Sequence, residues 1–379
     1  MPATAEANMY GIRCFHSNLS VRRYSQGISN PLNILFFGSD EFSIHSLRAL
    51  KELQLNGKSS VEDIQVVTRK PKWCGRQKSI LKYTPIIGAT EEFNLPEPIL
   101  CDTKQDLVNI PGLEKYNMII AVSFGKLIPS ELIGKMNYSL NVHPSLLPRY
   151  RGASPIQYAL LNNDKYVGVT IQTLHPEKFD HGAIVAQTSP LFTKDLLLKG
   201  ISSKFEENTP PKTATLMDQL GKVGGTLLEK VITEKLYMPG NHLNYSTGGI
   251  ESSYAPRISA NMKFISWAND SAVTLLNKLG AIGPVYSFKE ASVKGALQLK
   301  RVLLHKFEIS DLVPVGLNSP GDFSYDPQSQ SIFIKCAGDT FIRVNELQYE
   351  GFKIETAEQF SRRLKMRCGP ELCNKTSFL

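Results

Sequence analysis

Short apolar runs alternate with helical stretches through the first half of the chain, and this alternation restricts the fold more than any other feature. Residues 33–38 read NILFFG, an apolar run long enough for a buried strand. A helix is predicted over about residues 41–53, with Ser39 as its N-cap and with Asp40 and Glu41 complementing the positive end of the helix dipole. Further apolar runs follow at residues 64–68, 118–123 and 140–143. The pattern predicts an α/β fold with a Rossmann-like, mostly parallel sheet that helices cover on both faces.

The second half of the chain changes character after a polar stretch. Residues 192–211 are polar and contain two consecutive prolines, which predicts a connecting loop or insertion, and a helical pattern follows from residue 213 to about residue 236. Residues 239–253 are rich in Gly and Asn and are the best candidate for a linker. Alternating apolar residues at 331–335 and 341–344 then predict a small β-rich domain. The predicted division is a first domain at 31–238, a linker at 239–253 and a second domain at 254–379.

Composition and spacing exclude several classes of protein. The chain has 379 residues, 42% of them hydrophobic, which is enough to form a core in each of two or three domains. Its longest unbroken apolar run, residues 118–122, is far below the ~18 residues that a membrane span needs, so we expect no membrane partner. No Gly-x-Gly-x-x-Gly motif surrounds Gly38, and the acids at Asp40 and Glu41 would repel a pyrophosphate, so a dinucleotide site is not supported. The six cysteines lack Cys-x-x-Cys spacing and a neighbouring His cluster, so we expect reduced thiols and no metal site.

The amino-terminal 30 residues have the composition of an organelle address. Residues 1–30 carry Arg13, Arg22 and Arg23, several serines, and Glu6 as their only acid. Such a stretch, rich in Arg and Ser and poor in acids, is typical of a mitochondrial transit peptide, whereas a secretory signal would need a continuous apolar segment. An ordinary polar tail is the other interpretation. We predict import into the mitochondrial matrix.

The segment with the most chemical information is residues 141–155, NVHPSLLPRYRGASP. Asn141 and His143 are two residues apart at the end of a predicted strand, so their side chains point to the same face. Ligand sites in open parallel sheets lie beyond the carboxyl ends of the strands. At such an edge Asn can donate a hydrogen bond to an oxyanion while His transfers a proton, which suits acyl transfer. A hydrogen-bonded structural pair at a strand end is the alternative interpretation.

The same segment resembles the signature of folate-dependent formyltransferases, Asn-x-His-x-Ser-Leu-Leu-Pro followed by Arg-x-Arg-Gly. Its extension through residues 153–157 is most similar to the members of that family that act on methionyl-tRNA. Further stretches match the family in the same order, at residues 36–39, 123–129, 169–171 and 180–182, and more weakly at 254–258 and Trp267. The resemblance implies a Rossmann-like formyltransferase domain followed by a small, OB-like β-barrel domain that helps to bind tRNA.

The resemblance also implies which residues carry the reaction. Asp180, in an Asp-x-Gly turn with Gly182, matches a third catalytic residue of the family. In the implied mechanism the substrate amine attacks the formyl carbon of 10-formyltetrahydrofolate. Asn141 and a protonated His143 stabilise the oxyanion, while Asp180 holds His143 and assists proton removal. The turn that follows is expected to shape the folate site and consists of Ser145, Leu146, Leu147 and Pro148.

Clustered basic residues point to a polyanionic substrate. The formal net charge is +8 with a pI near 9.0, and residues 69–82 hold six Lys or Arg and no acid. Family members that act on methionyl-tRNA place a loop here into the acceptor arm, and the best matches within it are Arg76 and Lys78. Arg149 and Arg151 of the signature complete the residues predicted to bind initiator methionyl-tRNA. A second basic cluster on a helical stretch consists of Arg362, Arg363, Lys365 and Arg367.

Other functions remain open on the sequence alone. One is a formyltransferase for a small amine, such as glycinamide ribonucleotide or an amino sugar nucleotide, although the basic loop and the second domain argue against it. A second is hydrolysis of the folate by a similar domain. A third, from a different class, is a catalytically silent RNA-binding protein, which would tolerate the loss of Asn141, His143 and Asp180. We expect a monomer.

Overall fold

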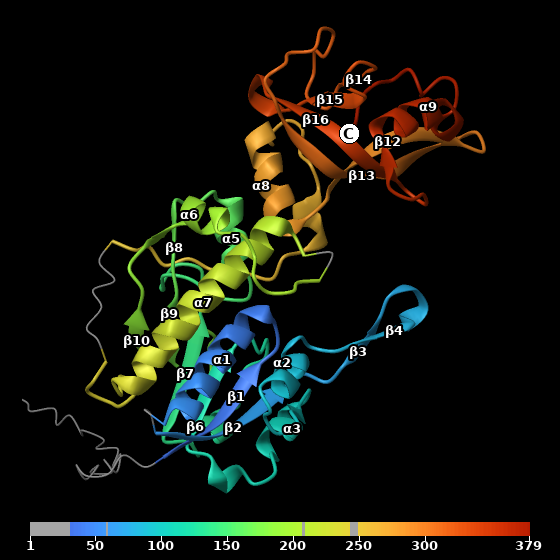
Figure 1. The fold of residues 1–379 in the computed structure, drawn as a ribbon. Coiled ribbons are helices and arrows are strands. Elements are labelled where there is room, and N and C mark those ends of the chain that lie inside the picture. The colour runs from blue at the N-terminus through green and yellow to red at the C-terminus, as the bar shows by residue number, and fades with distance from the viewer. Residues whose placement is uncertain (1–30, 58–59, 207–208, 243–248) are drawn as a thin grey trace, which may run out of the picture. The chain divides into compact units, whose positions relative to one another are not determined.

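The computed structural model describes residues 31–57, 60–206, 209–242 and 249–379. The predicted transit peptide at residues 1–30 lies outside this description. Two regular regions follow one another along the described chain, a mixed α/β domain and a β-rich domain (Figure 1). Of the helices that the structure describes, none is both long enough and apolar enough to cross a membrane.

The first domain is built on a sheet with the strand order β10-β9-β7-β6-β1-β2-β5. The pairs from β5 through β2, β1 and β6 to β7 are parallel, whereas β9 and β10 join the other edge antiparallel. The predicted mostly parallel sheet is therefore confirmed, with two antiparallel strands at one side. The strand bounds are β1 Leu32–Gly38, β2 Val61–Thr68, β5 Ile99–Leu100, β6 Met118–Val122, β7 Tyr138–His143, β9 Thr170–Thr173 and β10 Ile184–Gln187.

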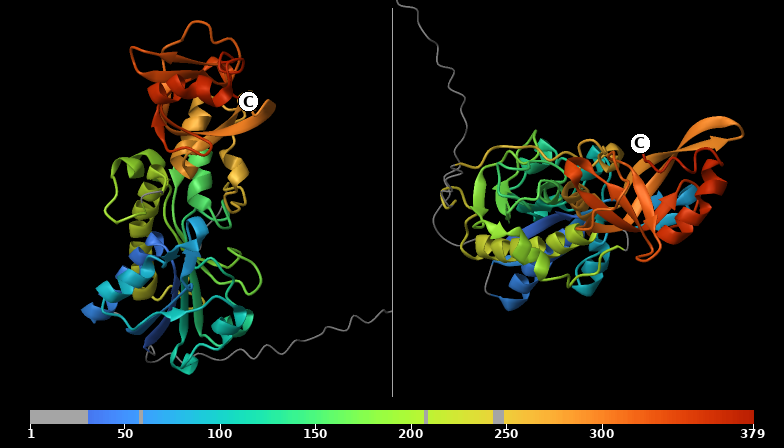
Figure 2. Two further views of the ribbon diagram at one scale, coloured as in Figure 1. Left: turned by 90° about the vertical axis from the view of Figure 1, so that its right-hand side faces the viewer. Right: turned by 90° about the horizontal axis from the view of Figure 1, so that it is seen from above.

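Alternate residues of the central strands enter different cores on the two faces of the sheet. In β1, Ile34 and Phe36 belong to one buried cluster, and Leu35 and Phe37 belong to another. Strands buried on both faces have continuous apolar runs instead of a polar alternation. The view along the sheet edge shows helices on both sides of it (Figure 2). The helices of this domain are α1 Glu41–Asn56, α2 Ile86–Glu92, α3 Lys104–Val108, α4 Ser130–Ile133, α5 Pro155–Leu161, α6 Thr193–Leu198 and α7 Pro211–Thr233.

Helix α1 begins at Glu41 as predicted, but its N-cap lies one residue later than predicted. Asp40, not Ser39, is the N-cap, and its Oδ1 accepts a hydrogen bond from the Ser43 amide at 3.1 Å. The extended backbone of Asp40 lets its carboxylate reach this amide, which is the usual geometry of a cap. Helix α1 packs against α7, where a Cβ on Gly221 would lie 2.4 Å from the His45 ring. Glycine at this position therefore permits the close contact between the two helices.

The predicted loop at residues 192–211 is partly helical. Its first part forms α6, and β11 Leu191–Phe192 before it pairs with β8 Tyr166–Val167. Leu196 of α6 is buried in the main core, which explains why a short polar stretch folds as a helix here. The prediction of a loop throughout this segment was wrong. A helix of six residues is too short to show a clear helical period of apolar residues in the sequence.

A short hairpin contains the basic segment and extends away from the sheet (Figure 1). It consists of β3 Lys72–Cys74, the 3₁₀ helix Arg76–Lys78 and β4 Ile80–Lys82. Near its base, the Oγ1 atoms of Thr68 and Thr84 lie 2.9 Å apart. The Ile86 amide then donates to the Ser39 carbonyl at 3.3 Å. The hairpin is thereby fixed to the carboxyl end of β1.

The second domain is a curled antiparallel sheet with the order β12-β13-β16-β15-β14, and β17 pairs with β16. It matches the predicted small β domain as an open half-barrel. Its core contains Trp267, Phe360 and Phe378, and the Trp267 and Phe378 rings stack at 6.1 Å. Its elements are α8 Ala272–Ile282, β12 Val285–Val293, β13 Ala296–Ser310, β14 Phe323–Asp326, β15 Ser331–Lys335, β16 Phe341–Tyr349, β17 Glu355–Thr356 and α9 Ala357–Cys368.

The end of the predicted linker runs beside the segment at residues 141–155. Tyr150 donates its amide to Ser253 Oγ at 3.0 Å, and the Arg151 amide donates to the Ser253 carbonyl at 2.9 Å. The Ala255 amide returns a bond to the Arg151 carbonyl at 2.7 Å. Residues 252–255 therefore act as an added strand-like support of this segment.

Candidate active site

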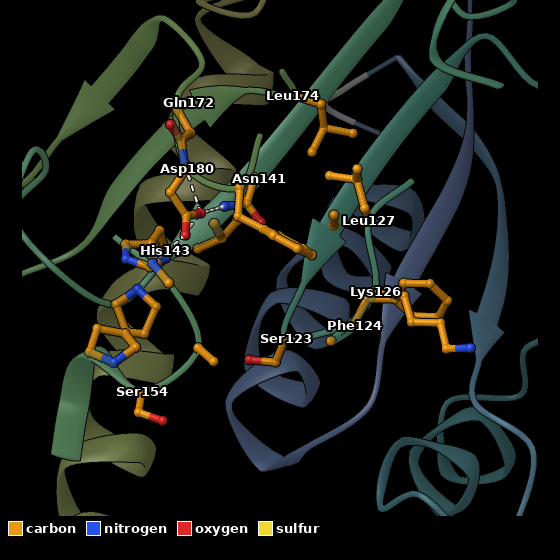
Figure 3. A pocket seen from close by; sticks show the side chains of 18 of the residues that line it. Ser123, Phe124, Lys126, Leu127, Asn141, His143, Ser154, Gln172, Leu174 and Asp180 are labelled. Atoms are coloured by element: carbon orange, nitrogen blue, oxygen red, sulfur yellow. Dashed lines mark hydrogen bonds and ion pairs between the residues drawn. The ribbon is translucent and has the colours of Figure 1, made fainter. Parts of the chain in front are cut away.

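Asn141 and His143 lie at the carboxyl end of β7, beside a cavity of about 400 Å³. Both side chains line this cavity, together with Asp180 and with Ser123 at the end of β6. The shared face predicted from the two-residue spacing is thus present. Figure 3 shows the three side chains of Asn141, His143 and Asp180 directed toward one another.

The Asp180 carboxylate is the centre of the arrangement. Its Oδ1 accepts hydrogen bonds from Asn141 Nδ2 and Gln172 Nε2, each at 3.1 Å, and lies 3.4 Å from His143 Nδ1. Its Oδ2 accepts the Gly152 amide at 2.8 Å. These donors fix the carboxylate in one orientation. An amide nitrogen has two N–H groups, so Asn141 can offer its second one to an oxygen in the cavity.

Both ring nitrogens of His143 face oxygen acceptors. Nδ1 faces Asp180, and Nε2 lies 2.9 Å from the Tyr150 carbonyl oxygen. Both ring nitrogens of His143 therefore have partners within the protein, whereas Asn141 beside it keeps an N–H for an oxygen in the cavity.

The turn that carries Asp180 depends on glycine. Asp180 has a positive φ of 56°, in the left-handed region. A Cβ added to Gly182 would lie 1.7 Å from the Thr173 carbonyl oxygen of the neighbouring strand β9. Only glycine can occupy this position without moving the backbone. The Asp-x-Gly pattern thus has a steric cause in this structure.

Gly182→Ala is expected to lower kcat of the reaction at this site about 10²-fold, because the displaced turn would carry Asp180 away from His143, and errors of about 1 Å have effects of that size. Gly88→Ala in α2 is the matched control, since a Cβ there meets nothing within 4 Å. Steady-state kinetics of the two variants check the prediction. Equal activity of both variants would contradict it.

Gln172 was missed in the sequence. It lies on β9 opposite Asn141 in the antiparallel pair, and it is 1% exposed. The sequence of β9, TIQT, is short and mostly polar, and nothing local in it indicates that this strand pairs antiparallel with β7. The available signal was Gln172 itself, because a polar side chain in a buried strand needs a hydrogen-bond partner.

The predicted folate-shaping turn, residues 145–148, is not brought into the cavity. Ser145 and Leu147 are buried, and the Leu147 amide donates to Thr170 Oγ1 at 3.1 Å. The Ser145 hydroxyl donates to the Arg149 carbonyl at 2.7 Å. These bonds hold the turn to Thr170 and Arg149, and its role in the folate site stays a prediction. The residues that line the cavity include 123–128 after β6 and 172–175 at the end of β9 and just after it.

The four basic residues predicted to bind tRNA fall into two groups. Lys78 is exposed in the hairpin, and Arg76 begins its 3₁₀ helix. By contrast, Arg149 Nη2 lies 2.7 Å from Asp164 Oδ1, and Arg151 Nε donates to the Asp180 carbonyl at 2.7 Å. The latter two guanidinium groups have partners within the protein, next to the turn that carries Asp180. The Arg149 side chain is nevertheless 44% exposed, and contact of either residue with RNA stays a prediction.

The second basic cluster also needs correction at Arg367. This residue is buried on α9 and forms an ion pair with Glu355, which also pairs with Arg363 at 2.8 Å. Its guanidinium lies 4.2 Å from the centre of the Phe352 ring. Arg367 therefore belongs to the core of the second domain, whereas Arg362 and Lys365 are exposed.

A further carboxylate, Asp40, lines the same cavity. Burial is the main cause that raises the pKa of Asp40 to about 7, and the neighbouring Glu41 adds to the effect. Hydrogen bonds from Ser43 and Ser123 oppose this rise only in part. Among the described residues, no group of three or more His, Cys, Asp and Glu side chains is placed to hold a metal ion.

Comparisons with known proteins agree with this geometry. The formyl transferase family profile matches residues 32–212, and the profile of the formyl transferase C-terminal domain matches residues 257–365. The mitochondrial methionyl-tRNA formyltransferase of Saccharomyces cerevisiae is 50% identical over 375 residues, which cover 92% of this chain and 93% of the relative. The human mitochondrial methionyl-tRNA formyltransferase is 27% identical over 313 residues, 81% of this chain and 72% of the relative.

Two solved structures resemble the fold of most of this chain. WlaRD, a sugar 3N-formyl transferase determined in the presence of dTDP and 5-N-formyl-THF, has a TM-score of 0.50 at 18% identity, and the match covers 86% of this chain and all of that one. An N-formyltransferase from Helicobacter canadensis, in complex with folinic acid and dTDP-3-aminofucose, has a TM-score of 0.51 at 16% identity and covers 83% of this chain and 98% of its own. At these identities the likeness concerns the fold.

Proposed function

The chain belongs to the formyl transferase family, and from this membership we propose that it transfers the formyl group of 10-formyltetrahydrofolate to the α-amino group of methionyl-initiator tRNA in mitochondria. One observation carries the proposal. The hydrogen-bonded group of Asn141, His143 and Asp180 lies in the cavity of a chain that is 50% identical, along nearly its whole length, to a mitochondrial methionyl-tRNA formyltransferase. The transit-peptide composition of residues 1–30 supports the location in the matrix.

The proposed reaction uses 10-formyltetrahydrofolate as the formyl donor. The neutral α-amine attacks the formyl carbon, and a C–N bond forms while the carbonyl oxygen becomes an oxyanion. Asn141 donates its remaining amide N–H to this oxyanion, and His143 beside it, in the protonated form that we propose, stabilises it by its charge. The bond from the formyl carbon to N10 then breaks, and a proton lost by the amine ends on N10, so that formyl-methionyl-tRNA and tetrahydrofolate leave. Asp180 holds His143 in place and, through water, accepts and returns the proton that moves.

The hairpin at residues 69–83 supports RNA as the acceptor. It presents basic side chains together with large apolar ones, of which Trp73 is 60% exposed and Tyr83 56% exposed. Lys and Arg contacts to phosphates supply affinity by releasing counterions, and exposed aromatic rings can stack on unpaired bases. A small-amine enzyme would gain nothing from such a surface.

The test is formyl transfer by the protein to charged methionyl initiator tRNA, with glycinamide ribonucleotide as the competing acceptor. We expect formyl-methionyl-tRNA as the product and little turnover of the ribonucleotide. Turnover of the ribonucleotide alone would overturn the assignment to tRNA.

Lys78→Glu is expected to raise KM for methionyl-tRNA several-fold with little change in kcat, and to reduce the salt dependence of binding by about one charge. Lys135→Glu is the matched control, because Lys135 is also exposed but lies between α4 and β7, outside the hairpin. Kinetics at two salt concentrations measure both effects. Identical behaviour of the two variants would remove the hairpin from the RNA-binding surface.

A further inference from the structure

Asp40 is the one carboxylate of the cavity that the mechanism above leaves unused. It follows β1 directly and caps α1, while Asn141 and His143 end β7 on the same edge of the sheet. All of them line the same cavity. Strand β6 lies between β1 and β7, and Ser123 at its end forms a hydrogen bond with Asp40. In Figure 3 the Ser123 side chain points into the cavity from the side opposite Asp180.

The two acids of the cavity differ in how their charge is compensated. Asp180 is surrounded by Asn141, Gln172, Gly152 and His143 as donors. Asp40 receives neutral donors only, and among the described side chains no Lys, Arg or His forms an ion pair with it. A carboxylate removed from water without a cation is unfavourable and will gain from a cationic ligand. The cavity therefore has an unfilled requirement for positive charge at Asp40.

The acceptor is the substrate that brings such a charge. An α-amino group has a pKa of about 7.7–8.0 in peptides and is mainly an ammonium at neutral pH. The formyl carbon of the donor is attached to a neutral nitrogen and offers no cation. We expect the bound RNA to reach the cavity near Asp40. The basic hairpin lies next to Asp40 in the fold, because the Ile86 amide that follows the hairpin donates to the Ser39 carbonyl.

We propose that Asp40 binds the α-ammonium group of the aminoacyl acceptor and takes up its first proton, so that the neutral amine is delivered to the formyl carbon beside Asn141 and His143. This role rests on the proposed function and makes Asp40 a residue that touches the acceptor. One N–H bond of the ammonium breaks, and the proton forms the O–H bond of the Asp40 carboxyl. The carboxyl returns this proton to solvent after the product leaves, while the second proton follows the path to N10 described above.

Other charged groups near Asp40 affect its pKa and therefore the pH at which its variants are best compared. On α1 the nearest is Glu41, which raises the pKa of Asp40 further. Glu41 in turn faces Lys82 of the hairpin and Glu206, and these two residues form an ion pair at 2.6 Å. The group after β6 that faces Asp40 is the neutral hydroxyl of Ser123.

Asp40→Asn is the deciding variant, since Asn caps a helix about as well as Asp but cannot accept the proton. We expect kcat/KM for methionyl-tRNA to fall about tenfold or more near pH 7, as hydrogen bonds to charged groups suggest, with KM for the folate donor unchanged. The deficit should shrink above pH 8.5, where the amine is already neutral in solution. Glu52→Gln, at an exposed position further along α1, is the matched control for a lost charge and should keep the wild-type profile.

Stability of the same variant shows independently whether the fold is kept. Since burial raises the pKa of Asp40 from 3.8 to about 7, ionisation costs the folded state increasing free energy as the pH rises through this range. Asp40→Asn should therefore melt at a higher temperature than wild type at pH 8 and at about the same temperature at pH 4. Asp40→Ser, which also keeps a capping oxygen, replaces it should Asp40→Asn fail to fold.

A second measurement uses initiator tRNA esterified with the α-hydroxy analogue of methionine as a competitive inhibitor. Wild type should bind this neutral analogue more weakly than methionyl-tRNA, and Asp40→Asn should bind the two about equally. A folded Asp40→Asn with a wild-type pH profile and wild-type KM values, or one with a raised KM for the folate donor, would overturn the proposal. If wild type formylates only a small amine, the proposed function fails, and the same comparison with that amine still decides the role of Asp40.

Discussion

Asp180→Asn is expected to lower kcat for formyl transfer by about 10²–10⁴-fold, the usual contribution of positioned acid–base groups. In the wild type, Asp180 Oδ1 accepts both the Asn141 and Gln172 side-chain amides, and Oδ2 accepts the Gly152 amide. An asparagine at this position turns one of these oxygens into a donor, which must face another donor. His143 also loses the anion beside its Nδ1. Single-turnover rates with saturating donor measure the effect directly.

Asp195→Asn provides the comparison for this variant, because Asp195 is exposed in the first turn of α6 and outside the cavity. It should retain wild-type kcat. Circular dichroism and a thermal melt of both variants would show that the fold is intact. If Asp180→Asn kept more than a tenth of the wild-type rate, Asp180 could not be the group that orients His143 for the reaction.

Glu355→Gln should reduce the free energy of unfolding of the second domain by about 3–5 kcal/mol, because it leaves the charge of Arg367 buried without a partner. Glu355 and Arg367 each have only 2% of the side chain exposed, and Arg363 adds a second cation at 2.8 Å. Urea unfolding followed by the fluorescence of Trp267, buried in the same core, measures the loss.

Glu358→Gln on the same helix is the internal control. Glu358 pairs with Arg362, whose side chain is 77% exposed, so its removal should change the unfolding free energy by less than about 1 kcal/mol. A loss of less than about 1 kcal/mol for Glu355→Gln would mean that water or a neighbouring group compensates Arg367 in solution.

Local patterns predicted the parts of the site that lie on a single strand or motif. The two-residue spacing of Asn141 and His143 was enough to place both at the cavity, because alternation along a strand is a property of the backbone itself. Asp180 was found only through the resemblance, because a loop acid carries no periodic signal. Its position depends on Gly182, whose steric role appears only when β9 is packed against the turn.

Long-range pairing explains what the sequence could not show. The partner of Asn141 across the sheet is Gln172, and that register follows from an antiparallel reversal at the sheet edge. Likewise, Arg367 was counted with a basic cluster on the sequence, but its side chain is buried and pairs with Glu355 of β17. A count of charges cannot separate solvated cations from those already paired.

The hydrogen bonds between residues 252–255 and the segment at residues 150–151 restrict where the first domain can be truncated or fused to another domain. Arg151 holds Ser252 through its guanidinium and both Ser253 and Ala255 through its backbone, while it also bonds the Asp180 carbonyl. A fragment that ends at the Gly-rich stretch would lose this support and release the catalytic turn. A fusion that gives this domain a new carboxyl-terminal partner must therefore retain residues 252–255. The junction between the two domains then lies after Ala255 and not within the Gly-rich stretch.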